Sequence, residues 1–131
     1  MTRGSACIIA VAFLLASAAA FADNREIHTF AGGQSIPATL TLYSSDGDPP
    51  GRRTPIFSNY RPKVDFGDGR EVICMFSIPQ AVRTIAPGET ADVSLSCKES
   101  VAVRASATRF LVVEGDKKVG FGDVRLPPPA P

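Results

Sequence analysis

Basic and aromatic side chains are concentrated in the segment GRRTPIFSNYRP, residues 51–62. Residues 52–70 contain five basic residues and only two acidic ones. Such a cluster could neutralise phosphate groups, so it is a candidate contact for RNA. Charge clusters are also common on solvated surfaces, and prolines in the segment favour a rigid turn. The RNA alternative would use these residues: Arg52, Arg53, Arg61, Lys63, Arg70, Lys117 and Lys118.

Catalytic and metal-binding sets are difficult to assemble from this sequence. The only histidine, His28, precedes the first clear strand, where a lone histidine is typical of a solvated surface. No G-x-S-x-G, H-E-x-x-H or phosphate-loop motif is present. Asp46 and Asp48 begin like a calcium loop but lack its later glutamate, and aspartates in such turns usually cap their own backbone. We therefore predict no enzyme activity, no cofactor and no metal.

Residues 1–22 have the layout of a secretory signal peptide. Arg3 precedes an uncharged run over residues 7–21, and an A-x-A exit ends at Ala22. A membrane-spanning helix is the alternative, but it needs about 20 apolar residues, and residues 16–20 contain only Ala and Ser. We predict cleavage after Ala22, a secreted or periplasmic product and no membrane anchor.

The predicted mature chain carries no net charge, because cleavage removes one of the 14 basic residues and none of the 13 acidic ones. A neutral domain lacks the overall field that draws proteins onto nucleic acid or anionic membranes. Any electrostatic binding must therefore come from a local patch.

Two cysteines, Cys74 and Cys97, remain in a compartment that permits disulfides. Both fall on the inward faces of predicted strands, on either side of the turn at residues 86–88. If residues 71–78 and 91–97 pair as a wide hairpin, the two side chains come within bonding range. A disulfide and two buried free thiols are the alternatives.

The elements that position these residues are predicted to be short β-strands, separated by turns rich in Gly, Pro and Asp. Residues 38–43, 71–78 and 91–97 alternate apolar and polar side chains, and residues 109–121 predict a hairpin turning at Gly115-Asp116. No window predicts an amphipathic helix. The pattern favours a small antiparallel barrel or sandwich, with a proline-rich tail over residues 127–131.

Three segments carry a family resemblance. GRRTPIFSNYRP resembles the start of the third, C-terminal domain of bacterial elongation factor Tu, where a Gly-Arg-x-Thr-Pro-x-Phe…Tyr-Arg-Pro run bends the chain. APGETADVSLS and TRFLVVEGDKKVGFGDV are similar to that domain's strand entry and hairpin, and the resemblance covers about residues 34–126. It implies a six-stranded antiparallel β-barrel over residues 23–126, with Phe57 and Tyr60 plugging one end.

The same resemblance has functional implications. The family's nucleotide-binding domain has no counterpart in this sequence, so no nucleotide and no GTPase role are expected. In the family, the third domain holds the T stem of aminoacyl-tRNA and contacts the exchange factor. We expect a non-catalytic exported module that docks a macromolecular partner, a protein, through its basic rim; RNA or tRNA binding and a structural relic are alternatives. The candidate binding residues are Arg52, Arg53, Thr54, Tyr60, Arg61, Glu114, Gly115, Lys117 and Lys118.

Overall fold

A computed structural model describes residues 26–128 of the chain. The predicted signal peptide, its cleavage site and the last three residues of the proline-rich tail lie outside this range. No helix in the described range is long and apolar enough to cross a membrane.

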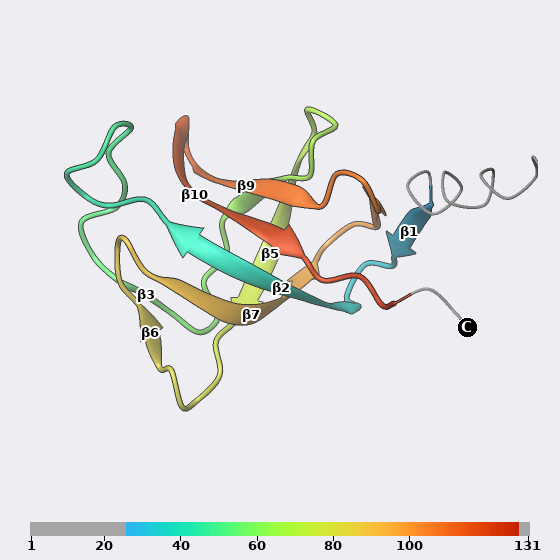
Figure 1. Cartoon of the computed structure of the whole chain (residues 1–131), viewed down its shortest axis with the longest axis horizontal. Helices are drawn as coiled ribbons and strands as arrows, with labels where there is room; N and C mark the ends of the chain where they lie inside the picture. Colours follow the sequence, from blue (N-terminus) through green and yellow to red (C-terminus); the bar gives the residue numbers. More distant parts are fainter. Residues whose placement is uncertain (1–25, 129–131) are drawn as a thin grey trace, which may run out of the picture.

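The described chain is built from β-strands joined by turns and loops (Figure 1). In chain order they are β1 (Ile27–Phe30), β2 (Ser35–Leu42), β3 (Ile56–Phe57), β4 (Lys63–Asp65), β5 (Glu71–Ser77), β6 (Thr84–Ile85), β7 (Thr90–Cys97), β8 (Val101–Arg104), β9 (Arg109–Glu114) and β10 (Lys117–Val124).

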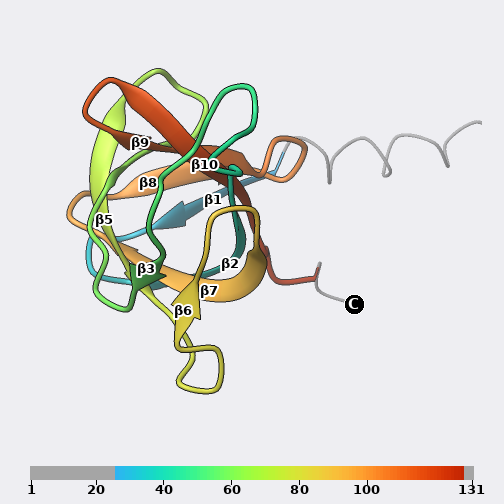
Figure 2. The ribbon, with the colours of Figure 1, turned by 90° about the vertical axis from the view of Figure 1, so that its left-hand side faces the viewer.

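Six of these strands form a closed antiparallel barrel in the order β10-β2-β7-β5-β4-β9. In Figure 2 they surround a common centre. The predicted fold class, a small six-stranded antiparallel β-barrel, is confirmed. Closure pairs every barrel strand on both sides, so the barrel itself has no free edge.

The barrel core follows from the period-two alternation of the strands. Along β5, Val72, Cys74 and Phe76 are buried while the residues between them face outward. The predicted inward faces of β2 and β7 are confirmed in the same way. Phe110 fills the barrel centre next to Gly122, where an added Cβ would overlap the Phe110 ring and the Thr39 carbonyl oxygen. The glycine therefore makes room for the aromatic ring.

Two small sheets supplement the barrel. β1 pairs with β8, and β3 pairs with β6; β1 lies at the opposite end of the barrel from β3 and β6 (Figure 1). The prediction that His28 precedes the first strand is wrong, because it lies within β1. Its imidazole is half-buried and its Nε2 atom is 3.3 Å from a carboxylate oxygen of Glu26. Four-residue strands such as β1 and β8 are too short for alternation to reveal them.

The two cysteines face each other across β5 and β7. Cys74 is in register with Cys97, their Cα atoms are 3.9 Å apart, and the side chains form a disulfide. Of the two predicted alternatives, the disulfide is the one present. The predicted hairpin is also confirmed: β9 and β10 pair with Glu114 opposite Lys117, and Gly115 in the turn has a positive φ of 61°.

Candidate functional site

Four of the predicted binding residues contact one another. Glu114, at the end of β9, accepts hydrogen bonds from the Arg52 guanidinium and from the Tyr60 hydroxyl. The Arg52 guanidinium carbon lies 5.2 Å from the centre of the Tyr60 ring. Arg52 also donates to the carbonyl oxygen of Thr54 at 3.2 Å and to its hydroxyl at 3.1 Å. We call Arg52, Tyr60 and Glu114 the rim triad.

The electrostatics of the rim triad suit a structural role. Burial raises the pKa of the Tyr60 hydroxyl above its usual range, and the hydrogen bond to Glu114 and its negative charge raise it further. Tyr60 therefore remains a protonated donor across the physiological range. The salt bridge between Arg52 and Glu114 is partly shielded, since the side chains are 21% and 33% exposed.

A second hydrogen bond holds the loop that begins at Gly51. The Lys117 ammonium donates to the carbonyl oxygen of Gly51 at 3.1 Å. The loop that begins at Gly51 is thus fastened to the β9–β10 hairpin at two points. Arg52, Tyr60, Glu114 and Lys117 are used inside the protein, which leaves less of the predicted rim for a partner.

The aromatic residues of this loop are placed differently from each other. Tyr60 packs against the core, with its ring 5.9 Å from that of Phe76. The prediction that Phe57 plugs the barrel end is wrong, because its side chain is 63% exposed. Alternation along β3 buries Ile56 and turns Phe57 outward.

The other predicted residues lie on the surface. Arg53, Arg61 and Lys118 are exposed and have no ion-pair partner within residues 26–128. Arg70, in contrast, lies 3.7 Å from Asp68 and 4.0 Å from Glu99, and it donates to the Ser100 carbonyl oxygen at 3.2 Å. Arg70 is therefore engaged at one end of the barrel.

Strand register brings further cations together on the outside of the barrel. Lys63 in β4 faces Ile73 in β5 on one side and Val113 in β9 on the other, and Val113 faces Lys118 in β10. The pairing of β5 with β7 puts Lys98 beside Ile73, whose carbonyl oxygen accepts the Lys98 N–H at 2.9 Å. Adjacent strands are about 4.8 Å apart, so successive lysines of this row are about 10 Å apart.

Arg61 lies next to this row. It lies two residues before Lys63, the first residue of β4, and the bridge between Tyr60 and Phe76 aligns it with Met75. We call Arg61, Lys63, Lys98 and Lys118 the basic wall. All four are exposed, and none has an ion-pair partner in the described part of the chain. Lys98 was not a sequence candidate, because only the register of β7 against β5 brings it to this face.

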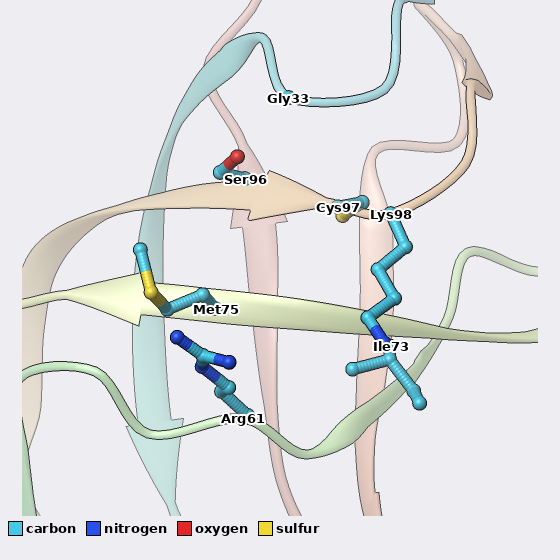
Figure 3. A pocket seen from close by; sticks show the side chains of 7 residues that line it. All are labelled: Gly33, Arg61, Ile73, Met75, Ser96, Cys97 and Lys98. Atoms are coloured by element: carbon cyan, nitrogen blue, oxygen red, sulfur yellow. The ribbon is translucent and has the colours of Figure 1, made fainter.

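A pocket of about 350 Å³ opens on the basic wall (Figure 3). Ile73 and Met75 of β5 lie between Arg61 on one side and Lys98 on the other (Figure 3). Figure 3 shows the Lys98 side chain extending beside Ile73, and the Arg61 guanidinium lying beside Met75. The complete lining is Gly33, Arg61, Ile73, Met75, Ser96, Cys97 and Lys98.

The chemistry available on this wall is recognition of anions and of apolar groups. The ammonium and guanidinium groups donate hydrogen bonds to carboxylate or phosphate oxygens, and the aliphatic floor accepts an apolar group. Within residues 26–128, no cluster of three His, Cys, Asp or Glu side chains could hold a metal ion. No protein-family model matches the sequence.

Proposed function

We propose that the protein is a non-catalytic binding module that docks an acidic macromolecule, a protein, against the basic wall. The observation that supports this most directly is four exposed cations on one continuous outer face without ion-pair partners among residues 26–128. A local field of one sign attracts oppositely charged partners and fixes their orientation, even when the whole chain is nearly neutral.

We also propose that the chain is an exported relative of the third domain of elongation factor Tu. The three sequence segments support this, and so does the six-stranded antiparallel barrel that the resemblance implies and the chain forms. The disulfide between Cys74 and Cys97 agrees with an oxidising compartment, which supports secretion or a periplasmic location.

The contacts within the rim triad determine which residues should be replaced to test docking. Arg52 is occupied by Glu114, so replacing it would test stability together with binding. Lys63, Lys98 and Lys118 make no ion pair in the described region and can be replaced with less effect on the fold. Their replacement is the sharper test of docking.

The test is capture of a partner from the exported fraction by immobilised protein. We expect the wild type to retain a partner, and a Lys63→Gln/Lys98→Gln/Lys118→Gln variant to lose it. Arg104→Gln is the matched control, because it removes an exposed cation of β8 that has no ion-pair partner in the described chain. Equal capture by the triple variant would reject the basic wall, and no capture by the wild type would favour a structural relic.

The RNA alternative is favoured by the same cations and by the tRNA contact of the resembling domain. It predicts a gel shift of tRNA at low salt that weakens steeply as salt rises, because phosphate neutralisation releases counterions. Absence of a shift at low salt would reject this alternative and leave the protein partner in place.

A further inference from the structure

The pocket on the basic wall combines an apolar floor with cations around it. Ile73 is 37% exposed and Met75 is half-buried, so both present aliphatic surface to the solvent. Arg61 and Lys98 border this floor on two sides. The volume of about 350 Å³ lies at the lower end of the range of small ligand sites and suits one large side chain.

The two charged residues that line the pocket, Arg61 and Lys98, are both cations. Lys63 faces Ile73 from β4, Lys98 extends beside Ile73, and Arg61 borders Met75, while Glu71 is the nearest acidic residue on the same face of β5. None of these cations meets a carboxylate within 4.0 Å in the part of the chain that the structure describes. An occupant that complements the site therefore carries an apolar group with negative charges beside it.

The side chains that line the pocket favour a protein over a nucleic acid as the partner. Single-stranded nucleic acids are held largely by stacking of bases on aromatic rings. The described residues that line the pocket include no aromatic side chain, and the exposed Phe57 borders a different hollow. The apolar floor of Ile73 and Met75 instead suits an aliphatic side chain, which gains free energy from burial without needing a flat partner.

We infer that the pocket binds a leucine-sized apolar side chain within an acidic segment of a protein partner. This inference rests on the proposed function and names the chemistry of the partner. The cations of the wall contact the flanking carboxylates, and the pocket takes the apolar anchor.

Fluorescence polarisation with two labelled peptides tests the inference. The peptide EDELEDE carries a leucine between acidic residues, and EDESEDE replaces it with serine at the same charge. We expect the wild-type protein to bind the leucine peptide about tenfold more tightly, the effect of burying one aliphatic side chain in a shallow site. A short single-stranded RNA serves as the alternative ligand.

Matched variants separate the apolar anchor from the charges. Ile73→Ser and, independently, Met75→Gln should reduce the preference for the leucine peptide to about twofold or less. Lys98→Gln should weaken binding of both peptides about equally, by about twofold to fivefold, because it removes an exposed ion pair that both peptides make. Arg104→Gln should leave both affinities unchanged. A thermal melt of each variant confirms that it is folded.

The outcomes distinguish this inference from the proposed function. Equal affinity of the wild type for the two peptides, or failure to bind either, would overturn the apolar anchor, whereas the capture experiment decides the basic wall separately. Binding of RNA without peptide binding would overturn the choice of a protein partner. A leucine preference that survives in both Ile73→Ser and Met75→Gln would overturn the assignment to this pocket.

Discussion

Glu114 accepts hydrogen bonds from two side chains, Arg52 and Tyr60, that lie 62 and 54 residues away in the sequence. Both donors belong to the loop that follows Gly51, so one carboxylate fixes the loop against the end of β9. The sequence identified all three residues as candidates, but it suggested a role in binding. Their pairing could not be derived, because alternation and turn signals give no distance between a loop and a remote strand end.

Replacing Tyr60 with phenylalanine tests the rim triad at the level of one hydroxyl. Tyr60→Phe keeps the ring against Phe76 and removes the donor to Glu114. We expect the free energy of unfolding to fall by about 1.5–3 kcal/mol, the usual contribution of a hydrogen bond to a charged group. Urea denaturation measures the change. Unchanged stability would show that the hydroxyl is not structural.

The same residue predicts a pH dependence. The folded protein raises the pKa of Tyr60 above that of the unfolded chain, so its contribution to stability is fully present below about pH 10. That contribution is lost as pH rises above this value, because the unfolded chain releases the proton first. Unfolding measured at alkaline pH should show a steeper loss in the wild type than in Tyr60→Phe, and parallel curves would contradict this prediction.

At the scale of elements, the strands with long alternating runs could be predicted and the short ones could not. β2, β5 and β7 each bury one face, which fixes the side of every residue along them. The outward turn of Phe57 was missed because β3 contains only two residues. The basic wall could not be predicted as a unit for another reason. It depends on the register of five strands, and the sequence of a single strand does not determine its register against its neighbours.

The disulfide between β5 and β7 gives a prediction at this scale. Cys74→Ala/Cys97→Ala should lower the free energy of unfolding by about 3 kcal/mol, the effect expected from removing a crosslink that spans 23 residues. Denaturant unfolding of oxidised wild type and of the variant measures it. Thiol titration of freshly exported, denatured protein should find neither cysteine reactive, and two reactive thiols would contradict the crosslink.

The packing of β10 against Phe110 gives a second prediction at the scale of elements. Gly122→Ala places a Cβ against the Phe110 ring and the Thr39 backbone, so we expect a loss of about 1–3 kcal/mol from overpacking. Gly47→Ala is the matched control, since the nearest atom to its added Cβ is 3.4 Å away. The control should change stability by no more than about 0.5 kcal/mol. Equal effects in the two variants would reject the steric explanation.

For the whole molecule, overall composition and local charge give different information. The chain has a formal net charge of +1, yet four cations without ion-pair partners in the described range share one outer face. The fold class could be predicted because it depends on many short signals that agree. The binding surface could not, because Arg61, Lys63, Lys98 and Lys118 become neighbours only when the barrel closes.

We expect the triple variant Lys63→Gln/Lys98→Gln/Lys118→Gln to lose binding without losing stability. It should lose partner capture while its melting temperature stays equal to or exceeds that of the wild type, because removing like charges from one face relieves repulsion. Differential scanning calorimetry checks this outcome. A clear fall in melting temperature would mean that these lysines support the fold.

The closed ring of backbone hydrogen bonds described for the barrel has a consequence for how this scaffold can change over evolution. Since no barrel strand depends on an outward-facing side chain for its pairing, residues on the exterior can be exchanged while the backbone stays as it is. New specificities can therefore arise by altering a few external side chains, and the ancestral shape persists beneath them.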